Sequence, residues 1–211
     1  MRTKLAIILS FFLLPHIISV NTPADVDIGL SVDKEGIKSF YLAIGDHYKA
    51  PEKEIAVVKK RKIPDEDLSV IFFLARSANV SSQAIIDLRL EGKTWMQITL
   101  HYGLGPGIYY VPVKEVKGPP YGKALGHFKN RPKNKWKEIV FDDIDIVNLV
   151  NLKFMSEYHG YSADEIIKMR AKGKNFILIN DDIKKIKKEK KQKASNKEAK
   201  AKAKNKGKKK K

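Results

Sequence analysis

The residues best suited to chemistry lie in one Gly/Pro-rich stretch, Val113 to Lys137. It carries eight Lys or Arg residues and one Glu, interleaved with Tyr121, Phe128 and Trp136. Basic groups bind phosphates, and aromatic rings stack on bases or sugars. The alternative is a surface loop whose aromatic residues cover the helices beneath it. The expected polyanion-binding residues of this stretch are Lys117, Lys123, Lys129, Arg131, Lys133, Lys135, Trp136 and Lys137.

A second basic segment ends the chain. Residues 184–211 hold sixteen Lys and two Glu, a net charge of +14 out of +18 for the whole sequence, so the remainder is close to neutral. Because apolar residues nearly vanish after Ile186, we expect a disordered tail. Its lysines suit an anionic lipid, an acidic envelope polymer or nucleic acid. A solubilising tail without a dedicated partner is the alternative. The last candidate contacts are Lys208, Lys209, Lys210 and Lys211.

No set of residues predicts catalysis, a cofactor or a metal site. The acidic residues 65–67 and 142–145 each precede an apolar helical pattern, where the helix dipole favours carboxylates. A hard-cation site at 142–145 is an alternative, but the Gly and the final Glu of a calcium loop are not in place. The histidines show no paired metal spacing, and the absence of Cys excludes disulfides and thiolate ligands. We therefore expect a protein that is not an enzyme.

An internal repeat organises the elements that must position these residues. Ser81 to Ile98 recurs at Ser162 to Ile179 with a constant offset of 81 residues. The shared residues predict a Ser helix start, an apolar face, a Gly stop and an aromatic residue that opens the next helix. In the second copy Ser162 and Glu165 also form a capping-box pattern. The repeat positions are Ser81, Ile85, Arg89, Gly92, Trp95 and Ile98, matched by Ser162, Ile166, Arg170, Gly173, Phe176 and Ile179.

Further helices are predicted around the repeat. Apolar spacing predicts one helix from Ile37 to Tyr48 and a second that starts near Pro51, and together they resemble a third, degraded copy. Helices that begin near residues 65 and 144 precede the two clear copies. His101 and His159 each suit a helix end. The residue pattern over 108–113 predicts a strand or an extended segment.

The stretch IIDLRLEGKTWMQITLHYGL, Ile85 to Leu104, resembles the first two helices of bacterial helix-turn-helix modules in transposases and small regulators. It follows the pattern I-x-x-[LM]-R-x-x-G-K-x-[WF]-x-x-I, which also resembles uncharacterised exported bacterial proteins. The resemblance implies a helical fold and, for the DNA-binding modules, a recognition helix after the second Gly. Here Leu104 to Gly107 replaces the start of that helix, and the second copy runs into Asp181 and Asp182.

The N-terminus has the pattern of a secretory signal. Arg2 and Lys4 precede the apolar run Leu5 to Leu14, which Pro15 ends and which is too short to span a bilayer. We expect a signal peptide over residues 1–24, and an uncleaved anchor or a buried helix is the alternative. The mature chain would then be exported, to a periplasm or to the extracellular space, with no transmembrane helix.

Together these features predict a mainly α-helical domain. A linker over 25–35 leads to a helical repeat domain over 36–183, with units at about 37–63, 65–103 and 144–183 and an irregular insert at 104–140. The disordered basic tail covers 184–211. The expected function is an exported binding or structural protein of the cell envelope whose basic tail contacts anionic surfaces. The alternative is a nucleic-acid-binding protein that uses the helix-turn-helix remnants and the tail.

Overall fold

The computed structural model describes residues 34–61, 63–115, 118 and 120–208, and it describes side chains as far as Lys197. The predicted signal peptide and residues 25–33 of the predicted linker lie outside the described residues. Every regular element in the described part is helical, as the sequence predicts. The elements are α1 (Lys34–Tyr48), α2 (Glu52–Lys60), η1 (Asp65–Asp67), α3 (Leu68–Ala78), α4 (Ser82–Leu90), α5 (Trp95–His101), η2 (Pro106–Tyr109), α6 (Gly122–Lys129), η3 (Lys133–Glu138), α7 (Asp143–His159), α8 (Ala163–Arg170) and α9 (Phe176–Lys208).

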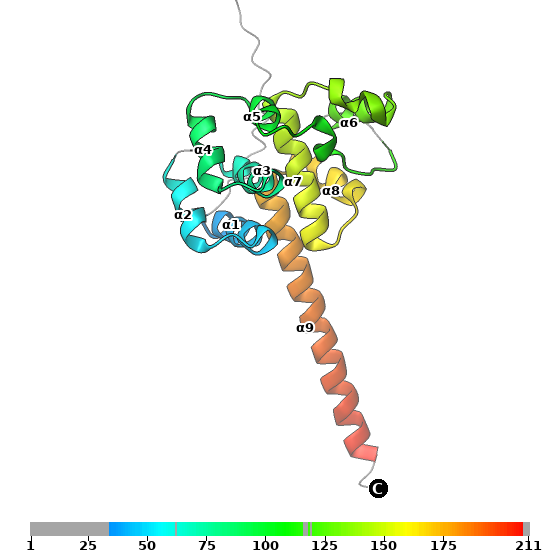
Figure 1. The fold of residues 1–211 in the computed structure, drawn as a ribbon. Helices are drawn as coiled ribbons and strands as arrows, with labels where there is room; N and C mark the ends of the chain where they lie inside the picture. The colour runs from blue at the N-terminus through cyan, green and yellow to red at the C-terminus, as the bar shows by residue number, and fades with distance from the viewer. Residues whose placement is uncertain (1–33, 62, 116–117, 119, 209–211) are drawn as a thin grey trace, which may run out of the picture.

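The core forms between the two lead helices of the repeat, α3 and α7, which pack directly against each other (Figure 1). α4 packs on α3, α8 packs on α7, and α1 covers both α3 and the first part of α9. The apolar run of α3 is buried from Leu68 to Ala75, because other helices cover it on several sides. On α7 the corresponding side chains Leu149, Leu152 and Phe154 are all fully buried.

The internal repeat is confirmed in three dimensions. Ser81 accepts a hydrogen bond from the Ala84 amide at the start of α4, and Ser162 does the same for Glu165 at the start of α8, where the predicted capping box is complete. Both Gly stops adopt the left-handed conformation, with φ of 84° at Gly92 and 80° at Gly173. Such values suit glycine because it has no Cβ.

The shared arginine holds each turn closed. The Arg89 Nη1 atom donates to the Lys93 carbonyl at 3.0 Å, and Arg170 Nη1 donates to the Lys174 carbonyl at 2.9 Å. Each guanidinium also lies over the aromatic ring that opens the next helix, 4.3 Å from the Trp95 centroid in the first copy. These paired contacts explain why an arginine and an aromatic residue recur together.

The first predicted unit, 37–63, shares the helix pair but not the last element. α1 ends at Lys49, which has φ of 58°, and Pro51 precedes α2 just as Ser81 precedes α4. The chain then passes through Pro64 into η1 and α3. The helix that follows α2 is therefore α3, which is already the lead helix of the next unit.

The insert is more regular than the sequence predicts. η2, α6 and η3 occupy much of 104–140, and no strand forms over residues 108–113. Pro106 opens η2, which places Tyr109 in the core with its ring against Phe73 and Phe141. Tyr110 to Val113 then continue without regular structure. Burial of these aromatic rings fixes the insert to the body.

The basic tail leaves the body as the continuation of α9. This helix extends to Lys208 and projects away from the body (Figure 1), and the last three residues of the predicted disordered tail lie outside the described residues. Lys, Ala and Glu favour helix, and the first turns of α9, buried at Phe176, Ile179 and Ile183, supply the costly nucleus. From Lys185 to Lys197 the side chains are exposed, as expected for a segment without an apolar face.

Candidate functional site

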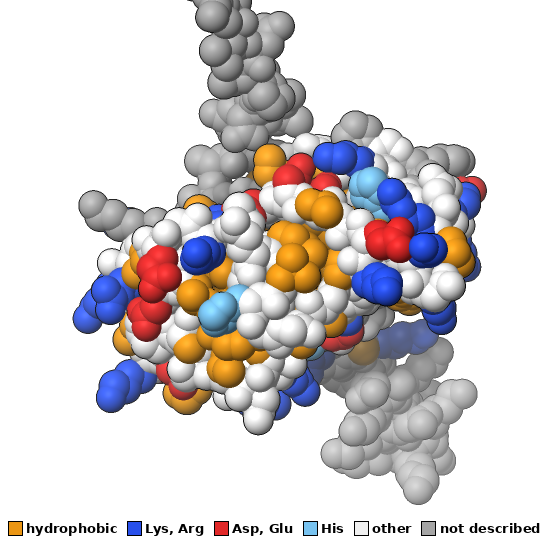
Figure 2. Space-filling model, turned by 45° about the horizontal axis from the view of Figure 1, so that its top comes forward, with side chains coloured by type: hydrophobic (Ala, Val, Ile, Leu, Met, Phe, Trp, Pro, Cys, Tyr) orange, Lys and Arg blue, Asp and Glu red, His pale blue; other side chains and the backbone are white. Residues whose placement is uncertain are grey.

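The basic residues of the insert gather at one end of the molecule. Lys and Arg side chains crowd the right-hand part of the space-filling view, over α6 and η3 (Figure 2). Lys129, Arg131, Lys133 and Lys137 are exposed there. Lys117 lies outside the described residues. The structure thus brings most of the predicted polyanion-binding residues of the insert onto one surface, which we call the insert surface.

Two of the predicted lysines are neutralised within the protein. Lys123 lies 3.5 Å from the Asp142 carboxylate and 3.9 Å from that of Asp145. Lys135 pairs with Glu138 at 3.0 Å. These exposed pairs contribute little to stability, but each lowers the local positive charge. The free charge of the insert surface therefore rests on Lys129, Arg131, Lys133 and Lys137.

The aromatic residues of the insert mainly hold it together. Tyr121 and Phe128 are buried, and only Trp136 is half-buried, with its ring centroid 4.8 Å from that of Tyr110. The Trp136 Nε1 atom donates to the Arg131 carbonyl at 3.1 Å, and the Lys133 Nζ atom lies over the indole, 5.9 Å from the ring centroid. Beside these rings is a groove of about 210 Å³, and Lys114 and Lys129 are among the residues that line it.

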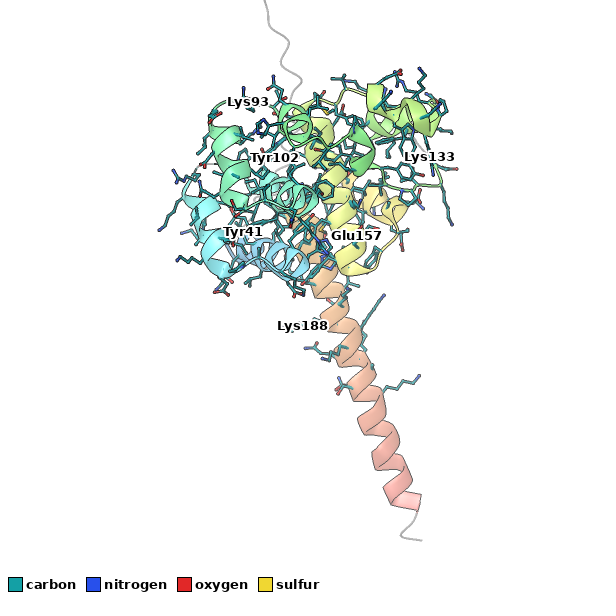
Figure 3. All side chains as sticks on the ribbon, in the orientation of Figure 1. Tyr41, Lys93, Tyr102, Lys133, Glu157 and Lys188 are labelled. Atoms are coloured by element: carbon teal, nitrogen blue, oxygen red, sulfur yellow. The ribbon has the colours of Figure 1, made fainter. Side chains whose placement is uncertain are left out.

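The second basic surface is the exposed part of α9, which we call the arm. Its described side chains include Lys188, Lys190, Lys191, Lys193 and Lys197, all exposed, with Glu189 as the acidic residue among them. Lys133 lies at the upper right of the body, and Lys188 lies on α9 just below the body (Figure 3). The backbone of Lys208 closes α9, and Lys209, Lys210 and Lys211 lie outside the described residues.

The base of the arm is anchored by polar contacts with the body. Lys184 Nζ donates to the Ser39 carbonyl on α1 at 3.0 Å, and Lys187 Nζ donates to the His159 carbonyl at 2.8 Å. The imidazole of His159 bonds the Asn180 side chain at 3.0 Å, as expected for a histidine at a helix end. Burial lowers the pKa of His159 to about 4, with the charges of Lys187 and Lys184 acting in the same direction. The arm is thus fixed at its base and free of the body beyond it.

A third site lies between the repeats, and sequence reasoning missed it. Arg89 and Arg170, which we expected to be only structural, both line one cavity of about 280 Å³. The other residues that line this inter-repeat pocket are Pro64, Glu66, Asp67, Asp143, Ile144, Val147 and Asn148. The available signal was that a charged residue, rather than an apolar one, recurs at the same repeat position.

Carboxylates in this pocket cap helices of the opposite repeat. Asp143, at the start of α7, accepts a hydrogen bond from the Trp95 amide at 2.8 Å, while Glu66 in η1 accepts one from the Phe176 amide at 2.7 Å. Asp67 is buried and bonds the Trp95 indole at 3.2 Å. Burial raises the pKa of Asp67, and the nearby Arg89 opposes that shift. Each repeat therefore completes a helix start in the other.

Within the described residues, no group of three or more metal-binding side chains could hold an ion. No helix in the described part of the chain is both long and apolar enough to cross a membrane. Comparison with protein-family models, with curated proteins and with solved structures finds no match to this chain. The candidate functional regions of the described structure are therefore the two basic surfaces and the inter-repeat pocket.

Proposed function

We propose that this protein is an exported, non-enzymatic binding protein that attaches to anionic lipid or polymer of the cell envelope. The arm carries the proposal: an anchored helix presents exposed lysines beyond the body with one described acidic residue between them. Each lysine held near an anionic membrane contributes about 1 kcal/mol of binding free energy. Five such lysines on the arm are enough for measurable attachment.

The export part of the proposal rests on the N-terminal sequence pattern alone, Arg2 and Lys4 before an apolar run. Attachment to an envelope surface suits an exported protein because such surfaces are rich in phosphates and carboxylates. The insert surface adds a smaller basic area on the part of the body from which the arm does not project. Two separate basic surfaces are suited to holding two anionic surfaces together.

The test compares the parent chain with an arm variant in which Lys188, Lys190, Lys191, Lys193 and Lys197 are all changed to Gln. Binding to vesicles of phosphatidylcholine and phosphatidylglycerol should weaken more than tenfold, given about 1 kcal/mol for each lysine. The matched control changes Lys129, Lys133 and Lys137 of the insert surface to Gln and should have the smaller effect. Unchanged vesicle binding by the arm variant would remove the basis of the proposal.

Binding to duplex DNA, measured in the same way, distinguishes the alternative nucleic-acid-binding function from envelope attachment. The position of a recognition helix is taken by the turn at Gly103 to Gly105 and by η2, so we expect no sequence-selective binding. Tight DNA binding that persists in the arm variant at physiological salt would favour the nucleic-acid function instead.

A further inference from the structure

The groove beside Tyr110 and Trp136, which we call the insert groove, is built on the extended segment after η2. Side chains of an extended chain point alternately to opposite sides, so Tyr109 and Val111 are buried while Tyr110 is 39% exposed and lines the groove. The Tyr110 and Trp136 ring centroids lie 4.8 Å apart, with the two rings tilted by 35°. Two neighbouring aromatic rings therefore line the groove and remain within reach of solvent.

The body holds these two rings in place. Phe128 on α6 packs edge-on against both, with its ring centroid 5.4 Å from that of Tyr110 and 4.9 Å from that of Trp136. The Trp136 Nε1 atom is fixed by its hydrogen bond to the Arg131 carbonyl. Leu125, buried on α6, lines the groove beneath them. Because the rings are already ordered, a ligand that stacks on them loses little affinity to ordering of the protein.

The same groove carries positive charge. Lys114, on the extended segment, and Lys129, in the last turn of α6, both line it and are both exposed. The Lys114 amide donates to the Asp164 carboxylate at 3.2 Å, which ties this lysine to the first turn of α8. The Lys133 Nζ atom lies 5.9 Å from the Trp136 ring centroid. No Asp or Glu is among the described residues that line the groove, so it suits an anionic ligand.

The size of the groove limits how far the anionic group of a ligand can lie from its stacked ring. The volume of about 210 Å³ is below the ~300–1,000 Å³ of pockets that hold drug-sized molecules. Since the lysines line the same small space as the aromatic rings, the ligand must carry its charge directly on a ring. A hexuronic acid does so, because its carboxylate is attached to the sugar ring. A nucleotide separates its base from its phosphate by a ribose, and a phosphatidylglycerol headgroup has no ring.

From this arrangement we propose that the insert groove binds a hexuronate unit of an acidic polysaccharide. The C–H face of the sugar ring lies on Tyr110 and Trp136, and its carboxylate lies between Lys114 and Lys129. The inference rests on the proposed envelope attachment, which it deepens by assigning a polymer ligand to the insert surface. The contacts themselves do not involve the arm, so the two proposals can be tested separately.

Calorimetric titration of the full chain with trigalacturonate tests the proposal. We expect a dissociation constant of about 1 mM or lower, within the range of weak small-molecule sites. The methyl ester of this trimer keeps the rings without the charge, and citrate keeps three carboxylates without a ring. Each should bind about tenfold more weakly or worse, because either the charge-assisted contact or the stacking contact is lost. Absence of trigalacturonate binding, or equal affinity for the ester, citrate or adenosine monophosphate, overturns the proposal.

Tryptophan fluorescence locates the bound sugar. The sequence holds two tryptophans, and Trp95 is fully buried in the core, so a change in emission on binding reports on Trp136. Trigalacturonate should change this emission with the same midpoint as the calorimetric titration. Calorimetric binding without a change in emission would place the sugar outside the insert groove and overturn the assignment.

Two pairs of lysine substitutions locate the carboxylate. Lys114→Gln together with Lys129→Gln should weaken trigalacturonate binding about tenfold or more and leave the affinity for the methyl ester unchanged. The matched control changes Lys123 and Lys135 to Gln, because these insert lysines already pair with carboxylates, and it should bind like the parent. All four side chains are exposed, so both variants should fold. Equal weakening in the two variants would show attraction to net charge alone and overturn the proposal.

The stacking contact is tested at Tyr110. Tyr110→Ala removes one ring and should lower the affinity for trigalacturonate about tenfold, whereas Tyr110→Phe keeps the ring and should retain the affinity of the parent. Unchanged affinity in a folded Tyr110→Ala variant contradicts the assignment.

The arm variant, with its five lysines changed to Gln, separates this inference from the proposed function. It should lose vesicle binding and keep the trigalacturonate affinity of the parent. A parent chain that binds vesicles but not trigalacturonate would overturn the uronate site alone. A parent chain that binds trigalacturonate but not vesicles would support the uronate site and overturn attachment through the arm.

Discussion

Arginine occupies the same position in both repeats and meets different partners in each. Arg89 and Arg170 both close a turn and lie over an aromatic ring, and these roles depend on the local sequence. In the part of the chain that the structure describes, Arg89 pairs with Asp143 and Asp67, which come from helices outside its own turn, and no such pair is found for Arg170. The contribution of each arginine to stability therefore depends on tertiary contacts as well as on the motif.

Replacement of each arginine by Met should reveal this difference. Arg89→Met leaves Asp143 and the buried Asp67 without their ion-pair partner, so we expect a loss of about 2–4 kcal/mol in unfolding free energy. Arg170→Met removes one backbone hydrogen bond and should cost about 1 kcal/mol. Urea denaturation measures both values. Equal losses of unfolding free energy in the two variants would show that the ion pairs of Arg89 do not stabilise the first repeat.

Protonation of His159 should destabilise the protein at acidic pH. Its pKa of about 4 in the folded protein is below the 6.5 of an exposed histidine, so the folded state favours the neutral imidazole. This stability is present above pH 6.5 and is lost as the pH falls toward 4, by up to about 3 kcal/mol. When the free energy of unfolding is measured from pH 7.5 to 4, it should fall more steeply for the parent than for His159→Gln. Parallel plots of unfolding free energy against pH would contradict this role of His159.

Helix ends show how the same element is built from different residues. α1, α3 and α7 each end at a residue in the left-handed conformation, with φ of 58° at Lys49, 55° at Asn79 and 71° at Gly160. Two residues later Pro51, Ser81 or Ser162 precedes the next helix. Asn and Gly tolerate this conformation, whereas Lys adopts it under strain. The common geometry supports the third copy that the sequence only suggests.

Substitutions at these ends should therefore have opposite effects. Lys49→Gly relieves left-handed strain and should stabilise the protein by up to about 1 kcal/mol, since the exposed pair with Asp46 adds little. Gly160→Ala should destabilise the protein by about 1 kcal/mol. The whole loss comes from backbone strain at positive φ, since an added Cβ meets no other atom within 4 Å. Thermal unfolding measures both changes.

The control for this pair is Lys38→Gly, the same chemical change at an exposed position inside α1. Glycine inside a helix costs about 1 kcal/mol, so this variant should be less stable than the parent. A loss of stability in Lys49→Gly as well would show that the left-handed residue carries no strain.

At the scale of the whole molecule, the boundary between body and arm lies within α9. Lys184 and Lys187 still bond the body, while the later described side chains are exposed and bond no other helix. The predicted domain boundary after residue 183 therefore falls before the last two anchors. Residues up to about 187 stabilise the body, and those beyond serve as a projecting basic helix.

Two truncations test this boundary. A chain that ends after Lys191 keeps both anchors, so its unfolding free energy should match that of the full chain within about 0.5 kcal/mol. A chain that ends after Ile183 loses both anchors and should be less stable by about 2–4 kcal/mol. Equal stability of the two truncated chains would place the boundary at residue 183, as the sequence suggested.

The sequence predicts local features of this fold well. The caps at Ser81 and Ser162 and the stops at Gly92 and Gly173 follow from chemistry within one or two turns. The inter-repeat pocket cannot be predicted in this way, because it depends on a hydrogen bond between Glu66 and the Phe176 amide, which are 110 residues apart in the sequence. The insert was expected to be irregular because Gly and Pro mask the burial of Tyr109 and Tyr121, which orders it.

The central claim, attachment to anionic surfaces by charge, is tested most directly by co-sedimentation of the full chain with lipid vesicles. The protein should bind vesicles that contain phosphatidylglycerol at physiological salt and fail to bind vesicles of phosphatidylcholine alone. Raising the salt to about 1 M, where the Debye length falls to about 3 Å, should release it. Equal binding to neutral vesicles, or binding that survives high salt, would contradict the account.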